Sequence, residues 1–322
     1  MPRVRDFWGK LLTTLLWAGV LVAVPLIGLR WVDSSIAMVA VLQSMVPVVA
    51  VGVTGLLVVA VVARRWRVAA VAGALFSVCA TLAVPSVLGH TATSGRDDLV
   101  VMSANLEFGR ADAPSLVTAV REHRVDVLVL LEVTPAFAER LTRAGLDSVL
   151  PESVGVSRQD AGGTIIRSRI PLTLVDPGID DVSPNSFNEP VVSVHRPDGD
   201  VVLRAVHSPP PIPSGARWWS GLADLWAWRE RQPAGQPLVM AGDFNSSLSH
   251  PGFRRVAETM TDAHRGAGQG WVRTWPVGSR VPPFIQLDHV LMRGLQVVDA
   301  GTVTIAHTDH RAIWARLSPP RH

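Results

Sequence analysis

Three long apolar runs fill most of the first 90 residues, and they restrict the possible architectures of this chain more than any other feature. They cover residues 11–29, 36–63 and 68–88 and contain no charged side chain. Each is long enough to cross a hydrocarbon core of about 30 Å, which takes roughly 20 helical residues. A buried helical bundle is the alternative, but three successive runs of this kind are rare in soluble domains. We therefore predict a membrane domain, residues 1–90, with three transmembrane helices.

The first run is too long for the core of a signal peptide, which spans about 7–15 residues, so we expect it to remain in the protein as a helix. Pro25, Pro47 and Pro85 lie inside the three runs and predict kinks there.

The charges that flank the runs predict the orientation of the membrane domain. Six basic residues precede the first run or separate the second from the third: Arg3, Arg5, Lys10, Arg64, Arg65 and Arg67. The loop between the first two runs carries only Arg30 and Asp33. Because positive charge marks the cytoplasmic side, the N-terminus is expected to be cytoplasmic. After three crossings, the rest of the chain would lie outside the cytoplasm. The protein would then be a multi-pass protein of the plasma membrane.

The remainder of the chain has the composition of a globular domain. With 322 residues the chain is long enough for roughly two domains of about 150 residues. A net charge of only +3 indicates no strong general attraction to nucleic acid. Cys79 is the only cysteine, which excludes an intramolecular disulfide and a cysteine metal cluster. We expect a polar linker at residues 91–98 and one soluble domain at residues 99–318. No protein partner can be identified from the sequence.

Short apolar runs alternate with helical patterns in the soluble domain. The strands are expected at residues 99–105, 126–133, 163–167, 191–195, 201–207, 238–241, 287–292 and 312–317. The helices are expected at residues 114–123, 135–144 and 214–231, and the first two begin with a proline in the first turn. Many strands with few helices favour an α+β sandwich.

Polar residues recur where the predicted strands end. They are Asn105, Glu107, Glu132, His207, Asp243, Asn245, Asp288, Asp309 and His310. Taken singly, each could be an ordinary turn or loop residue. A charged group that closes an apolar strand is costly if it is buried without a partner, so the recurrence at successive strand ends indicates a shared site.

In this order, six motifs resemble the endonuclease/exonuclease/phosphatase superfamily. They are Asn105-Leu-Glu107, Glu132, His207-Ser-Pro, Gly242-Asp243-Phe244-Asn245, Leu287-Asp288-His289 and Thr308-Asp309-His310. The resemblance covers about residues 98–318, and its most specific pieces are the Gly-Asp-Phe-Asn and the terminal Asp-His motifs. It implies a four-layer α/β sandwich, with two packed mixed β-sheets flanked by helices, and metal-dependent hydrolysis of phosphoesters.

The same resemblance implies a metal site. Glu132 would be the principal ligand with Asn105 beside it, and Glu107 and Asp309 would bind metal or shape the site. Oxygen ligands with few nitrogens and no sulfur suit Mg²⁺ or Mn²⁺ rather than structural zinc.

The remaining motif residues would act on the substrate. By resemblance, Asp243 orients or deprotonates the attacking water and Asn245 hydrogen-bonds the phosphoryl oxygens. His310 would contact the phosphate or transfer a proton, with Asp288 fixing its ring. His207 corresponds to an acid/base histidine of the deoxyribonuclease branch, but its carboxylate partner is not identifiable in the sequence.

Two further residues are predicted to bind substrate. Arg167 lies near the end of a predicted strand where relatives have Ser-Arg, and the alternative is a solvated surface arginine. Trp275, in the segment Trp271-Val-Arg-Thr-Trp-Pro, could line a substrate groove, and the alternative is packing in the core.

The membrane domain favours a lipid substrate, because an anchor confines enzyme and lipid to one surface. Together with His-Ser-Pro-Pro, Gly-Asp-Phe-Asn and Thr-Trp-Pro, it also resembles actinobacterial membrane phosphatases associated with teicoplanin resistance. That resemblance implies a polyprenyl (undecaprenyl) pyrophosphate or another lipid phosphate as substrate. One alternative is an anchored extracellular nuclease, although no dense arginine cluster is visible. Another is a non-catalytic envelope scaffold, although no site residue is missing.

Overall fold

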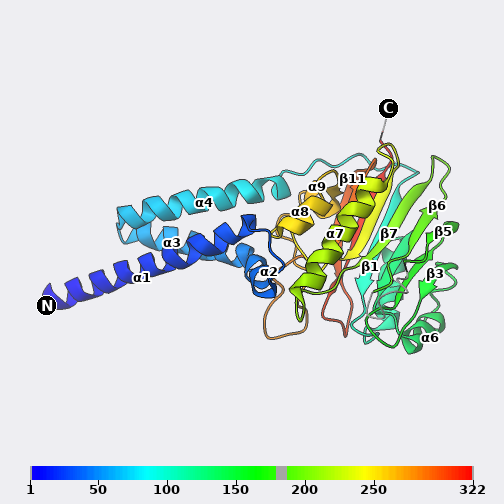
Figure 1. Cartoon of the computed structure of the whole chain (residues 1–322), viewed down its shortest axis with the longest axis horizontal. Coiled ribbons are helices and arrows are strands. Elements are labelled where there is room, and N and C mark those ends of the chain that lie inside the picture. The colour runs from blue at the N-terminus through cyan, green and yellow to red at the C-terminus, as the bar shows by residue number, and fades with distance from the viewer. Residues whose placement is uncertain (1, 179–186, 321–322) are drawn as a thin grey trace.

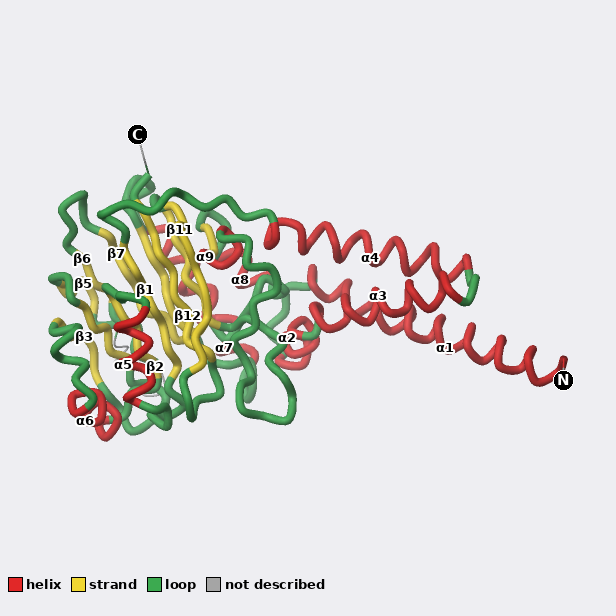
Figure 2. The backbone as a smooth tube through the Cα atoms, turned by 180° about the vertical axis from the view of Figure 1, so that it is seen from behind, coloured by secondary structure: helices red, strands yellow, loops and turns green. Residues whose placement is uncertain are grey.

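The computed structural model describes residues 2–178 and 187–320, and it consists of an arm of helices joined to a body of two β-sheets (Figure 1). The helical arm contains α1 (Pro2–Gly28), η1 (Leu29–Trp31), α2 (Ala37–Ser44), α3 (Val46–Val62) and α4 (Trp66–Val87). The N-terminus and the α3–α4 turn lie at the end of the arm that is remote from the sheets (Figures 1 and 2).

The structure of the arm differs from the predicted three continuous transmembrane helices, because the second apolar run is not one straight helix. Two segments, Asp6–Trp31 and Trp66–Val87, are long and apolar enough to cross a membrane. Helices α2 and α3, which occupy the second apolar run, are bent by 48° at a break between them. They provide a third crossing only if the bent pair is counted as one broken span.

The break between α2 and α3 has a local cause. Proline has no N–H, so Pro47 in the first turn of α3 cannot donate to the carbonyl of Gln43. The buried Gln43 side chain bonds elsewhere: its Nε2 donates to the carbonyls of Leu29 and Val32, each at 2.8 Å. Helix α2 is thus tied to the end of α1. The other two prolines of the apolar runs lie inside helices that continue past them.

The first sheet of the body has the strand order β11-β12-β1-β2-β4-β3. Its strands are β1 (Leu99–Asn105), β2 (Val127–Leu131), β3 (Glu152–Val156), β4 (Thr164–Ser168), β11 (Gln296–Thr304) and β12 (Arg311–Ser318). Only β1 and β2 run parallel, so the sheet is mixed. Both strands are buried along their whole length, as expected for short uninterrupted apolar runs.

The second sheet has the order β5-β6-β7-β8-β10-β9 and is also mixed, because β7 and β8 run parallel. Its strands are β5 (Leu172–Asp176), β6 (Val191–Val194), β7 (Val201–His207), β8 (Leu238–Asp243), β9 (Thr261–Asp262) and β10 (Asp288–Arg293).

The body has four layers. A buried apolar cluster that includes Val129 and Val239 lies between the two sheets. Helices α5 (Ala113–Glu122) and α6 (Pro135–Arg143) cover the first sheet, and α7 (Gly215–Arg231) and α8 (Pro251–Val256) cover the second. The short helix α9 (Ala263–Gly266) follows β9. The predicted α+β sandwich of two mixed sheets flanked by helices is therefore confirmed.

The helical arm is packed against the second sheet's outer helices. Nε2 of His250 donates to the carbonyl of Ala40 in α2 at 3.0 Å. Ala40 is fully buried in the same apolar cluster as Trp218 of α7. A Cβ atom on Gly215, at the start of α7, would lie 2.3 Å from the carbonyl oxygen of Ser35. Only glycine allows the segment before α2 to approach α7 this closely.

Candidate active site

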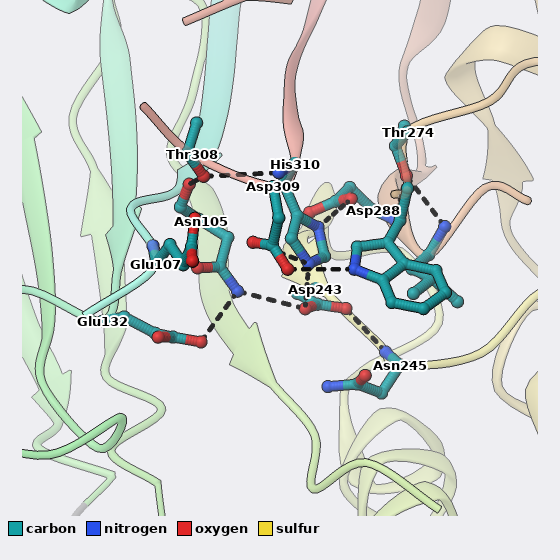
Figure 3. Close-up of polar contacts among 12 residues, drawn as sticks. Asn105, Glu107, Glu132, Asp243, Asn245, Thr274, Asp288, Thr308, Asp309 and His310 are labelled. Carbon is teal, nitrogen blue, oxygen red and sulfur yellow. Dashed lines mark hydrogen bonds and ion pairs between the residues drawn. The ribbon is translucent and has the colours of Figure 1, made fainter. Parts of the chain in front are cut away.

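The polar residues that follow the strands meet at one edge of the two sheets (Figure 3). β1 and β2 end side by side, with Asn105 paired in register with Leu131. In the second sheet, His207 at the end of β7 is paired with Asp243 at the end of β8. Asp288, the first residue of β10, is paired with Asp243. Because the sheets pack face to face, these strand ends converge.

Asp243, Asp288 and His310 form the buried centre of the site. The Nδ1 atom of His310 donates to Asp288 Oδ2 at 2.8 Å, and its Nε2 lies 3.7 Å from Asp243 Oδ2. One nitrogen or oxygen atom from each of the three residues lies within 4.8 Å of the other two, so the three side chains form one compact cluster.

Burial and charge set the protonation of this centre. Burial raises the pKa of Asp243 to about 6, although the positive charge of His310 opposes the rise. Burial alone would lower the pKa of His310, but the carboxylates of Asp288 and Asp243 outweigh it and raise the pKa to about 10. At neutral pH the centre therefore pairs an ionised Asp243 with a protonated His310.

Asn105 links this centre to Glu132. Its Nδ2 donates to Glu132 Oε1 at 3.1 Å and to Asp243 Oδ2 at 3.2 Å. Glu132 has a φ of 59°, a left-handed conformation that is uncommon for a residue other than glycine and typical of functional positions. The backbone N–H of Phe108 donates to Glu132 Oε2 at 2.8 Å. Burial raises the pKa of Glu132, and these hydrogen bonds oppose the rise.

Glu107 and Asp309 lie at the rim of the site. The backbone N–H of Glu107 donates to Asn105 Oδ1 at 3.0 Å, whereas its carboxylate pairs with Arg110 at 2.7 Å. Glu107 thus contacts the site through its backbone. Asp309 Oδ2 accepts a hydrogen bond from Trp275 Nε1 at 3.1 Å, and its Oδ1 lies 4.0 Å from His310 Nε2. Trp275 is therefore a neighbour of the site.

His207 is buried beside Glu132, with 3.7 Å between its Nε2 and Glu132 Oε1. Its ring stacks on Phe187 with 4.2 Å between the centroids, and its backbone N–H donates to Glu189 Oε1 at 2.9 Å. Burial lowers the pKa of His207, so its neutral form is favoured. Among the residues that the structure describes, none hydrogen-bonds to Nδ1 of the ring.

Asn245 is fixed by three contacts. Its backbone N–H donates to Asp243 Oδ1 at 2.8 Å, and its Nδ2 donates to the carbonyl of Ser208 at 2.8 Å. Trp218 Nε1 donates to the Asn245 carbonyl at 3.0 Å. The φ of 46° at Asn245 is again left-handed, a conformation that asparagine tolerates better than most residues.

Two threonines support the site although the sequence analysis assigned them no role. Thr308 Oγ1 donates to the carbonyl of Asn105 at 2.8 Å. Thr274 Oγ1 accepts from the backbone N–H groups of Leu287 and Asp288, at 3.0 and 3.3 Å. Thr308 directly precedes Asp309 and Thr274 directly precedes Trp275, two residues that are predicted to belong to the site. No other pattern in the sequence indicates a role for the threonines. Their partners are distant in the chain.

Arg167 is not part of the site, which corrects the prediction that it binds substrate. It pairs in register with Leu128, whereas Leu131 is the β2 residue at the site edge. Its guanidinium donates to Asp147 at 2.5 Å and to the carbonyl of Leu150 at 2.7 and 3.0 Å. The guanidinium of Arg167 is therefore already bonded to the carboxylate of Asp147 and the carbonyl of Leu150.

The donors at this edge fit a divalent cation. Asp243 and Asp288 place two buried carboxylates side by side, and the partly buried Glu132 adds a third that is joined to Asp243 through Asn105. Buried carboxylates repel one another, and a cation would relieve that repulsion. Hard oxygen donors are those that Mg²⁺ and Mn²⁺ prefer. The geometry thus combines oxygen donors suited to a cation with a charged histidine, groups that hydrolysis of a phosphate ester requires.

The sequence matches the model of a known protein family. The model of the "Endonuclease/Exonuclease/phosphatase family" matches residues 102–310, which is more than half of the chain. No curated protein matches the sequence.

Solved structures share the fold of the body. TDP2 from D. rerio in complex with a single-strand DNA product has a TM-score of 0.55 and 16% identity, covering 69% of this chain and 99% of that one. Truncated TDP2 from Caenorhabditis elegans has a TM-score of 0.56 and 15% identity, covering 69% and 98%. A functionally unknown conserved protein from Enterococcus faecalis V583 has a TM-score of 0.54 and 14% identity, covering 69% and 100%. At these identities the likeness concerns the fold alone.

Proposed function

This chain belongs to the endonuclease/exonuclease/phosphatase family, and from that premise we propose that it is a metal-dependent phosphohydrolase anchored in the membrane. The observation that carries the proposal is the cluster of carboxylates, amide and histidine at the strand ends, where Asn105, Glu132, Asp243, Asp288 and His310 lie together.

Glu132 and Asn105 would hold the divalent cation, Mg²⁺ or Mn²⁺, and Asp309 would complete that side of the site. When bound, the cation neutralises charge on the phosphoryl oxygens. Asn105 keeps Glu132 and Asp243 at a fixed separation through its two hydrogen bonds. Glu107 contributes mainly through its backbone contact with Asn105.

The second half of the site would act on water and phosphate. Asp243 is oriented by the backbone N–H of Asn245 and accepts the proton of the attacking water. His310 is held by Asp288, and its Nε2 would donate to a phosphoryl oxygen. Asn245 would add a donor if its side-chain amide moved from the carbonyl of Ser208 to the phosphate. His207, buried next to Glu132, would act on the leaving group.

The contact between arm and body supports a substrate at the bilayer. Helix α2 is hydrogen-bonded to His250, whose Nδ1 accepts from the backbone N–H of Ser247 at 2.8 Å, and this loop also carries Asn245. The loop that carries Asn245 is therefore joined to the arm, which contains two segments that are long and apolar enough to cross a membrane. A lipid phosphate, with polyprenyl pyrophosphate as the first choice, would be concentrated at such a site.

A substrate panel tests the proposal. Purified full-length protein with Mg²⁺ is assayed against a polyprenyl pyrophosphate, a lipid monophosphate, sphingomyelin and DNA. We expect phosphate release to be fastest from the lipid pyrophosphate. If DNA were cleaved best, an anchored nuclease would replace the lipid phosphatase.

The body is proposed to lie outside the cytoplasm. The N-terminus and the α3–α4 turn, where the basic residues gather, both lie at the end of the arm remote from the body (Figure 1). A common cytoplasmic side for both ends agrees with the preference of positive charge for that side. A reporter fused after His322 should therefore behave as extracytoplasmic, and one inserted at Arg65 as cytoplasmic. The reverse pattern would exclude an external substrate.

A further inference from the structure

An apolar cavity of about 520 Å³ lies where the helical arm meets the body. Helices α3 and α4 separate toward the body (Figures 1 and 2), and residues of both line the cavity, Ala50 and Thr54 from α3 and Phe76 and Ala80 from α4. Its lining on α4 runs from Phe76 to Val87, a length of about 16 Å at the rise of an α-helix. We call this cavity the arm groove.

The arm groove has the position and composition of a site for a hydrocarbon chain. Its α4 wall belongs to the segment Trp66–Val87, which is apolar enough to cross a membrane. The body adds Trp271 to the rim, with 43% of its surface exposed and its Nε1 hydrogen-bonded to the carbonyl of Phe284. Exposed tryptophans of this kind gather at the boundary between hydrocarbon and water.

Two cations line the end of the groove next to the body. The Arg30 guanidinium donates to the carbonyl of Leu248, and the charge of Arg265 lies near enough to repel that of Arg30. No carboxylate is among the described residues that line the groove. The carboxylate of Asp262 is engaged by His289 Nδ1 at 2.5 Å and by the backbone N–H of Arg265 at 3.0 Å. Within the described chain, the Arg265 guanidinium has no hydrogen-bond acceptor.

We propose that the arm groove binds one hydrocarbon chain of an anionic, phosphate-headed membrane lipid, whose headgroup contacts Arg30 and Arg265. Two like charges beside an apolar surface favour an amphiphile with an anionic head over both a neutral lipid and a free anion. This lipid site is separate from the catalytic centre, so it goes beyond the proposed hydrolase function.

The bound lipid would also contact a segment that reaches the active site. Ile285 lines the groove and forms an isolated β-bridge with Trp275, whose Nε1 donates to Asp309. Residues of the same segment, 271–285, thus line the groove and contact the rim of the active site.

Binding of radiolabelled phosphatidylglycerol to purified full-length protein in detergent tests the proposal, with chelator present so that no hydrolysis contributes. We expect phosphatidylglycerol to bind more tightly than phosphatidylcholine, and millimolar inorganic phosphate not to displace it. Arg265→Gln should weaken binding about fivefold, the effect of about one surface charge on an anionic lipid. The matched control is Arg231→Gln, which removes an exposed arginine outside the groove.

Filling the groove tests the chain-binding part. Ala80→Trp on α4 and Val51→Trp on α3 both line the groove and should abolish binding. Ala74→Trp, an exposed position of α4 outside the groove, should bind like the wild type. The proposal is overturned if both filling variants bind as well as Ala74→Trp, if Arg265→Gln changes nothing, or if inorganic phosphate competes at the same concentration as the lipid. These results leave the hydrolase proposal unaffected, because activity is not the readout.

Discussion

The Glu132 carboxylate is held by its neighbours, since a backbone N–H and the Asn105 amide each occupy one of its oxygens. Glu132→Gln keeps the size of the side chain, removes one negative charge and gives up one of these two hydrogen bonds, so the fold should survive while affinity for Mg²⁺ falls by about 100-fold or more, beyond the usual effect of a residue that only supports a ligand. Titration calorimetry with Mg²⁺ measures the loss, and Glu139→Gln, an exposed acid on α6, is the control. Full activity of the wild type in excess chelator would contradict the metal assignment.

Asp243 and His310 face each other across 3.7 Å and should act as one unit. Each alanine substitution is expected to lower turnover by about 10²–10⁴-fold, the usual contribution of an acid/base group. Because groups that act together are non-additive, the double variant should be little slower than either single variant. Steady-state rates of the three proteins decide the matter, and near-wild-type turnover in a single variant would remove that residue from the mechanism.

At the residue scale, the convergence of side chains could be predicted where the polarity of a side chain conflicts with its surroundings. Asp243, Asp288 and His310 interrupt or flank apolar strands, and the structure places them together, whereas their catalytic roles stay predictions. The prediction for Arg167 was wrong because the position of a strand residue relative to its neighbours depends on how the strands pair. Its guanidinium bonds to Asp147, and no local pattern in the sequence indicates that contact. Thr274 was missed for the same reason, since its hydroxyl bonds to the backbone of Asp288 from another segment.

At the scale of elements, the strands that carry the site were foreseeable and the edge strands were not. β1, β2 and β8 are wholly buried, and each begins with a continuous run of apolar residues. β3 and β5 are mostly exposed edge strands without alternation, and β9 has only two residues. β11 contains a register shift between Val297 and Asp299 that interrupts its period. Helix α2, which precedes the bend, also contacts the body, and an apolar run alone does not reveal that contact.

The contact between α2 and the body should weaken in acid because of His250. Its Nδ1 accepts a hydrogen bond from Ser247 and its Nε2 donates to Ala40, an arrangement that requires the neutral ring. Burial lowers the pKa of His250 to about 4, and the charges of Arg254 and Arg30 add to the effect. Below pH 6.5, the ordinary pKa of histidine, the unfolded chain binds more protons than the folded chain. The free energy of unfolding therefore falls as the pH decreases from about 6.5 toward 4.

The loss at His250 should amount to about 3 kcal/mol once the ring is protonated, at roughly 1.4 kcal/mol for each unit of pKa. Denaturant unfolding of the full-length protein between pH 7 and 4 measures it. His250→Gln cannot titrate, so its stability should depend less on pH in this range. If the free energy of unfolding changed equally with pH in the wild type and the variant, protonation of His250 would not be the cause of the weaker contact between α2 and the body.

At the scale of the whole molecule, the proposed function predicts that activity depends on a fixed relation between the arm and the body. The arm alone would serve as a tether, and the body alone has the fold of its structural neighbours. The contacts of α2 with α7 and with the His250 loop join the two parts close to Asn245. If the substrate is a lipid, this joint should matter for a headgroup in a bilayer and not for a soluble one, because the joint contributes orientation and no catalytic group.

The contact between the arm and the body can be disturbed by adding one methyl group at Gly215. A Cβ at Gly215 would lie 2.3 Å from the Ser35 carbonyl oxygen and 2.5 Å from the Ala37 nitrogen, so Gly215→Ala should push the segment before α2 away from α7. Gly235→Ala is the matched control, because nothing lies within 4 Å of its added Cβ. We expect Gly215→Ala to lower hydrolysis of membrane-embedded polyprenyl pyrophosphate by roughly tenfold or more, since small errors of position are costly in catalysis. Hydrolysis of a short soluble pyrophosphate should be unchanged in both variants. An equal loss on both substrates would mean that Gly215 supports the active site itself, and no loss on either would mean that the arm is a simple tether.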